Sequence, residues 1–223
     1  MGGWAWRRVA NLLRERGLRC CVPTLTGVGD RAHLSHATID LDLHIRDVIN
    51  TCQFDDVEHP WLVGHSYGGL VATGVAQRLA GDVSGLVILD GYVVSPGQSA
   101  FSAYPEVREL LNPYITASHP DFIQPLPVSA FDIHDEQIAS ELSRKLRPMP
   151  LCTHTSRLAF SELTQRQLRR TYLRCTEFPL FAATASRAAA SGWSVHDIRA
   201  GHMALFTHPN RVAEAILAIV QAA

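Results

Sequence analysis

Residues 61–69 limit what this chain can fold into more than any other stretch. A short apolar run at 61–63 leads into the pattern Gly-x-Ser-x-Gly at 64–68, and a helix-compatible run follows at 69–80. A strand, a tight turn and a helix in this order are typical of a nucleophile elbow, which holds a serine hydroxyl clear of a sheet. We expect Gly64 and Gly68 both to be required, because side chains at these positions would collide. Ser66 is the predicted nucleophile.

The rest of the chain alternates strand-like and helix-like segments. Short apolar runs typical of buried strands lie at 18–22, 84–89, 170–175 and 193–198, and apolar residues at helical spacing lie at 4–16, 38–52, 180–190 and 209–220. This alternation predicts a mostly parallel, doubly wound α/β sheet with helices on both faces. Its functional site is expected at the carboxyl ends of the strands.

Residues 95–150 interrupt this alternation. Prolines divide the segment into short pieces with aromatic and aliphatic residues, and two short helices are expected near 105–111 and 135–146. The segment is too long for a plain connection, so we interpret it as a cap inserted over the strand ends. The predicted organisation is a core formed by 1–94 and 151–223, with a cap at 95–150.

Composition narrows the class of function. The formal net charge of −1 gives no electrostatic footprint for nucleic acid or an anionic membrane, and no apolar run approaches the length of a transmembrane span. Five cysteines without C-x-x-C spacing argue against a disulfide framework or a zinc site. We expect a cytoplasmic protein whose partner is a small-molecule substrate, without a metal or cofactor. Its oligomeric state is left open.

A serine nucleophile needs a base, and the base needs a carboxylate to orient it. On this topology both should follow Ser66 at the ends of later strands, in the order serine, acid, histidine. His202 directly follows the last predicted strand and is the expected base. Asp90 and Glu177 each close a strand, so either could be the acid. We favour Asp90, because it comes immediately after a wholly apolar strand.

Several motifs resemble one branch of the α/β-hydrolase superfamily, namely the small esterases that include plant methylesterases and hydroxynitrile lyases with their bacterial relatives. They are Gly-Gly-Trp-Ala-Trp-Arg-Arg-Val-Ala at 2–10, Gly-His-Ser-Tyr-Gly-Gly at 64–69, Leu-Asp-Gly-Tyr-Val at 89–93, Tyr-Leu-Arg-Cys-Thr at 172–176 and Gly-His-Met-Ala at 201–204. The resemblance implies Ser66 as nucleophile, His202 as base and the N–H of Tyr67 as one oxyanion-hole donor.

Two departures from this branch matter. Where plant members place an aspartate after a Cys-Thr-Glu-like segment, this chain has Phe178, which supports Asp90 as the acid and leaves Glu177 as the alternative. Members also usually carry a strand and a His-Gly loop before the Gly-Gly-Trp segment, and the loop supplies the second oxyanion donor. Here Met1 directly precedes Gly2. Either the natural chain starts further upstream, or Gly2 or Gly3 supplies that donor, or the protein is catalytically impaired.

The resulting hypothesis is a serine hydrolase that cleaves small carboxylic esters through an acyl-enzyme, with Tyr92, Tyr104 and Phe131 contacting substrate. One alternative is a lyase of the hydroxynitrile type. Such lyases resemble one another in carrying a lysine in the cap that handles the nitrile, and Lys145 is the single lysine of the predicted cap. The other alternative is a catalytically impaired member that binds a small molecule.

Overall fold

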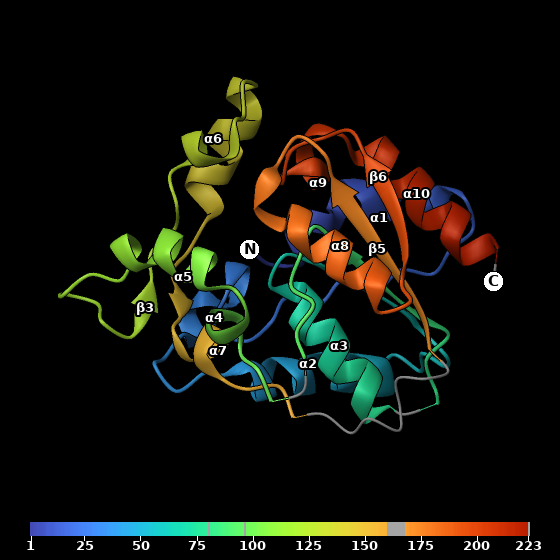
Figure 1. The fold of residues 1–223 in the computed structure, drawn as a ribbon, viewed down its shortest axis with the longest axis horizontal. Coiled ribbons are helices and arrows are strands. Elements are labelled where there is room, and N and C mark those ends of the chain that lie inside the picture. Colours follow the sequence, from blue (N-terminus) through green and yellow to red (C-terminus); the bar gives the residue numbers. More distant parts are fainter. Residues whose placement is uncertain (80, 96, 160–167, 223) are drawn as a thin grey trace.

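The computed structural model describes residues 1–79, 81–95, 97–159 and 168–222. Its centre is a four-stranded parallel sheet in the order β1-β2-β5-β6 (Figure 1). The strands are β1 Trp61–His65, β2 Gly85–Leu89, β5 Arg169–Cys175 and β6 Ser194–Ile198. All three neighbouring pairs run parallel. The predicted parallel α/β architecture is therefore confirmed.

Helices cover both faces of this sheet, and the residues of β2 show why. Successive side chains of a strand point to opposite faces. Leu86 and Ile88 pack into a core shared with α2 Leu41–Phe54, α3 Gly68–Arg78 and α8 Ala182–Ala190. Val87 and Leu89 pack into a second core with α1 Arg7–Glu15 and α10 Pro209–Gln221. All five residues of β2 are buried, as a strand between two helical layers requires.

Local chemistry sets the start of some helices. The carboxylate of Asp40 accepts a hydrogen bond from the N–H of Leu43 at 2.9 Å and so caps α2. Short 3-10 turns precede two helices, η1 Gly3–Trp6 before α1 and η6 Pro179–Phe181 before α8. A further turn, η2 Gly29–Leu34, and the helix α9 Ala204–Thr207 were not predicted. The expected end of the elbow helix at Ala80 lies outside the described residues.

The strand expected at 18–22 is wrong. These residues form no strand, although the segment is apolar except for Arg19. A strand exists only through a ladder of hydrogen bonds with a neighbour. Here the N–H of Leu18 donates to Leu13 at the end of α1, and the carbonyl of Cys20 accepts from the guanidinium of Arg14. The segment borders a cavity in place of a neighbouring strand.

The segment between β2 and β5 carries most of the irregular structure, and Figure 1 shows much of it standing to one side of the sheet. Both expected helices are present, as α5 Pro105–Leu111 and α6 Glu136–Lys145. The other elements are α4 Ala100–Ala103, η3 Asn112–Tyr114, β3 Phe122–Ile123, η4 Val128–Phe131, β4 Met149–Pro150 and α7 Cys152–Thr155. Strands β3 and β4 pair antiparallel. The division into core and cap stays a prediction.

Two further features bear on the sequence expectations. None of the helices in the described part of the chain is long and apolar enough to cross a lipid bilayer. All five cysteines are free thiols, and burial raises the pKa of the Cys175 thiol.

Candidate active site

The elbow holds Ser66 in a backbone conformation that residues other than glycine rarely adopt. Ser66 lies between the end of β1 and the start of α3 with φ of 53°, in the left-handed region. Backbone hydrogen bonds keep it there, because its N–H donates to Leu89 and its carbonyl accepts from Gly69 and Tyr92. The strain at this residue is therefore held by two neighbouring strand ends.

The glycines around Ser66 differ in how strictly they are required. A Cβ at Gly64 would lie 2.3 Å from the carbonyl oxygen of Gly68, so no side chain fits there. A Cβ at Gly68 itself would meet nothing within 4 Å, and the expectation that sterics require this glycine is wrong. Gly91 is the glycine that the motif does not reveal. A Cβ there would lie 2.5 Å from the carbonyl oxygen of Ser66.

The structure brings Asp90 and His202 together. The Nδ1 of His202 lies 2.6 Å from Oδ2 of Asp90, and the carboxylate is fully buried. Asp90 itself has φ of 40°, and its other oxygen accepts a hydrogen bond from the N–H of Cys175 at 3.3 Å. A carboxylate only accepts, so Nδ1 of His202 carries the hydrogen and Nε2 of the neutral ring is left as a base. Glu177 lies elsewhere, half exposed and paired with Arg199 at 3.2 Å.

Ser66 and His202 line the same cavity. Among the described residues, no hydrogen bond joins Oγ of Ser66 to the ring of His202. Hydrogen bonds between a nucleophile and its base are often long in unliganded enzymes and tighten when substrate binds.

Aromatic rings surround the imidazole of His202. Phe178, Phe181 and Phe131 stack on it, with ring centroids 4.7, 5.7 and 6.1 Å away. Phe131 thus contacts the predicted base as well as the cavity. Phe181 was missed by the sequence reasoning, because nothing in its Ala-rich surroundings marks it as different from a core residue. These rings limit the access of water to His202 and hold its plane.

His65 packs against His202 from the elbow side. The two ring centroids lie 4.5 Å apart, and Nε2–H of His65 donates to the backbone carbonyl of His202 at 2.8 Å. Burial lowers the pKa of His65 well below its ordinary value, so the ring is neutral at neutral pH. His65 therefore fixes the loop that carries His202.

The backbone N–H of Tyr67 lies at the N-terminus of α3, where helix N–H groups lack partners. No acceptor for it exists in the part of the chain that the structure describes. The side chain of Tyr67 is fixed in turn: Nε2–H of His44 donates to the carbonyl of Thr26, and Nδ1 accepts from the Tyr67 hydroxyl at 2.9 Å. The N–H of Gly3 donates to Oγ1 of Thr24 and is not free for an oxyanion.

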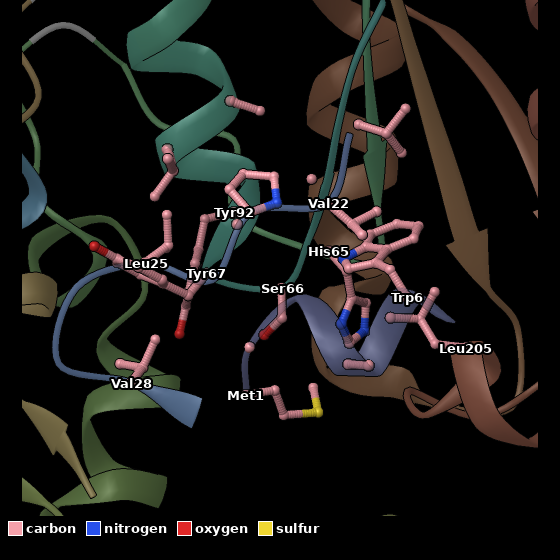
Figure 2. A pocket seen from close by; sticks show the side chains of 18 of the residues that line it. Met1, Trp6, Val22, Leu25, Val28, His65, Ser66, Tyr67, Tyr92 and Leu205 are labelled. Carbon is pink, nitrogen blue, oxygen red and sulfur yellow. The ribbon is translucent and has the colours of Figure 1, made fainter. Parts of the chain in front are cut away.

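A cavity of about 1160 Å³ opens beside Ser66. Figure 2 shows Ser66 at its centre, with His65 and Trp6 on one side and Tyr67 and Leu25 on the other. The volume suffices for a small organic molecule. The described residues hold no group of three or more His, Cys, Asp or Glu side chains that could bind a metal ion.

The three aromatic residues predicted to contact substrate have different surroundings. Tyr92 and Phe131 line the cavity. Tyr104 does not, because its ring is fully buried and its hydroxyl bonds to both the N–H and the carbonyl of Val93. The structure thus gives Tyr104 a packing role. His154, which the sequence analysis did not single out, lines the cavity instead.

Comparison with known proteins agrees with this architecture. The alpha/beta hydrolase family model matches residues 1–215. A "Carbendazim hydrolyzing esterase" of Nocardioides sp. (strain SG-4G) is 33% identical, with 98% of this chain and 95% of that protein covered. Many solved structures are similar in fold, and two of them illustrate the likeness. One is an extracellular alpha/beta-hydrolase from a Paenibacillus species, with a TM-score of 0.86, 21% identity, and 98% of this chain and 94% of that one covered.

The other is the Arabidopsis methylesterase protein MES16, with a TM-score of 0.76, 21% identity, and 100% of this chain and 95% of that one covered. The family model covers nearly the whole chain, including the elbow and the loop of His202. With a parallel sheet, a strained serine between strand and helix, and a buried Asp–His pair at the strand ends, the chain belongs to the alpha/beta hydrolase family.

Proposed function

We propose that this protein is a serine esterase that hydrolyses small carboxylic esters through a Ser66–His202–Asp90 triad and an acyl-enzyme. The observation that carries the proposal is the buried 2.6 Å contact between Nδ1 of His202 and the carboxylate of Asp90, beside the cavity that holds Ser66. A buried carboxylate of this kind stabilises the imidazolium that forms during catalysis.

The first half-reaction forms the acyl-enzyme. Oγ of Ser66 attacks the carbonyl carbon of the ester while its proton passes to Nε2 of His202. The oxyanion of the tetrahedral intermediate accepts a hydrogen bond from the N–H of Tyr67, where the dipole of α3 also favours negative charge. The bond to the alcohol oxygen then breaks, and the alcohol leaves with the proton from His202.

The second half-reaction releases the acid. Nε2 of His202 takes a proton from water, which attacks the acyl carbonyl. The bond from carbon to Oγ of Ser66 breaks, and Oγ recovers its proton from His202. Asp90 stays ionised throughout and holds the ring so that Nε2 faces the reacting atoms.

The relatives support ester hydrolysis as the reaction class. A curated relative that covers 98% of this chain is named as an esterase, and one of the similar structures is a methylesterase protein. The lyase alternative relies on Lys145, which pairs with Glu141 at 2.7 Å and lies over the ring of Trp4. Lys145 does not line the cavity that contains Ser66. No observation therefore favours the lyase over the esterase.

Pre-steady-state hydrolysis of p-nitrophenyl acetate tests the proposal. We expect a burst of one p-nitrophenolate per active site, followed by slower turnover, and an acetyl adduct on the intact protein. Ser66→Ala should abolish the burst and the adduct. The matched control is Ser118→Ala, an exposed serine, which should behave as wild type. Folded wild-type protein without burst or adduct would contradict the proposal and favour a catalytically impaired member.

A further inference from the structure

His154 is a buried histidine in the cavity wall that the proposed mechanism does not use. It lies in α7 and is 5% exposed. Its ring stacks on Tyr67 with centroids 5.1 Å apart, and the ring centroids of Tyr92 and Phe101 lie 5.9 and 5.4 Å away. Since Tyr67 directly follows Ser66, these contacts hold the imidazole within the same cavity as the predicted nucleophile.

The hydrogen bonds around His154 fix which ring nitrogen carries the hydrogen. The hydroxyl of Thr153 donates its one proton to the carbonyl of Pro150 at 2.6 Å. Oγ1 of Thr153 can then only accept from Nδ1 of His154, 2.9 Å away. Burial lowers the pKa of His154 to about 3, so the ring is neutral at neutral pH. Nδ1 therefore bears the hydrogen, and Nε2 is a bare acceptor.

The described part of the chain leaves this acceptor open. Within the described ranges no group donates a hydrogen bond to Nε2 of His154. An acceptor that the described residues leave open in a cavity wall can take a hydrogen bond from a bound molecule. A second polar atom supports the same conclusion. The buried amide nitrogen of Gln124, which is also a residue of the cavity wall, has no hydrogen-bond partner among the described residues.

We propose that His154 is a specificity-determining residue whose Nε2 accepts a hydrogen bond from an N–H or O–H group of the substrate. The preferred substrates are then uncharged aromatic esters that carry such a donor. The rings of Tyr67 and Tyr92, which line the cavity next to His154, suit an aromatic body. This inference rests on the proposed function, because it names the substrate class of that same cavity.

A matched pair of probes tests the donor requirement. Indole and benzofuran have nearly the same shape, but indole offers an N–H where benzofuran has an oxygen acceptor. Titration calorimetry on the Ser66→Ala protein measures their binding without any turnover. We expect indole to bind about three- to tenfold more tightly, the worth of one neutral hydrogen bond. Equal affinities, or tighter binding of benzofuran, would overturn the proposal.

Two further variants in the Ser66→Ala background assign the preference to His154. His154→Leu removes the acceptor and should abolish the preference for indole while leaving benzofuran affinity within twofold. Thr153→Val removes the partner of Nδ1, so the hydrogen moves to Nε2 and the ring becomes a donor toward the cavity. The preference should then shift toward benzofuran. Persistence of the indole preference in either folded variant would overturn the assignment.

The ring nitrogens can also be observed directly. Long-range ¹H–¹⁵N spectra of the labelled protein separate a protonated ring nitrogen from an unprotonated one. We expect protonated Nδ1 and bare Nε2 in His154, with the reverse in Thr153→Val. A wild-type spectrum with hydrogen on Nε2 would contradict the proposal. Because none of these readouts needs hydrolysis, an inactive wild type that still prefers indole would refute the esterase alone.

Discussion

Replacing Asp90 by asparagine tests the proposed orientation of the base most sharply. The side chain is fully buried, with one oxygen 2.6 Å from Nδ1 of His202 and the other 3.3 Å from the N–H of Cys175. Because the N–H of Cys175 needs an acceptor, the asparagine oxygen should face Cys175 and its NH₂ group should face His202. The NH₂ group then donates to Nδ1, and the ring hydrogen moves to Nε2.

A ring with hydrogen on Nε2 cannot take the proton of Ser66. In the Ser-His-Asp template this change lowers kcat by about 10⁴-fold, or about 5.5 kcal/mol of activation free energy. We expect a loss of this order in p-nitrophenyl acetate hydrolysis by Asp90→Asn, with folding intact because the packing is nearly unchanged. The matched control is Glu177→Gln. Its exposed pair with Arg199 is worth about 0–1 kcal/mol, so activity should change less than twofold.

The two variants also decide between the carboxylates that the sequence left open. A tenfold or smaller loss in folded Asp90→Asn would refute the reasoning. So would a loss in Glu177→Gln as large as that in Asp90→Asn.

Three further predictions follow from the geometry. Gly91→Ala places a Cβ against the backbone of Ser66 and should lower kcat at least tenfold and the free energy of unfolding in urea by about 1–3 kcal/mol. Gly68→Ala instead fills open space on α3 and should leave that free energy unchanged or raise it by about 0.5–1 kcal/mol. Equal effects of the two variants would contradict this prediction. Because the pKa of His154 is lowered from 6.5 to about 3 in the folded state, the unfolded chain binds this proton more readily, and the free energy of unfolding should fall as the pH drops below 6.5. His154→Leu should reduce the slope of the free energy of unfolding against pH by about 1.4 kcal/mol per pH unit in acid titrations. Lys145→Met should change ester hydrolysis less than twofold; a large loss would revive a role for the cap lysine.

Much of the fold was predictable because it depends on local pattern. Strand β2 at 85–89 has no polar side chain, so burial between two helical layers follows from composition alone. The segment at 18–22 is also mainly apolar apart from Arg19 but forms no strand, because strands also need a neighbour at hydrogen-bonding distance. For residues 18–22 the sequence pattern therefore predicted neither the exposure of the segment nor its lack of a strand partner.

The site divides in the same way. Ser66, Asp90 and His202 were named from motif and chain order, and the structure groups Asp90 with His202. The roles of Tyr104 and His154 could not be separated from the sequence, since both are single aromatic residues in irregular segments. Which of them faces the cavity depends on long-range packing: the hydroxyl of Tyr104 reaches back to Val93, whereas the ring of His154 stacks on Tyr67.

The most direct measurement is the intact mass of the protein after treatment with a fluorophosphonate, which labels only activated serines. The account predicts one adduct per chain in wild type, mapped to Ser66, and none in Ser66→Ala. Asp90→Asn should label far more slowly, while Glu177→Gln labels at the wild-type rate. Folded wild-type protein that takes up no label, or an adduct that persists in Ser66→Ala, would contradict the assignment of Ser66 as the nucleophile.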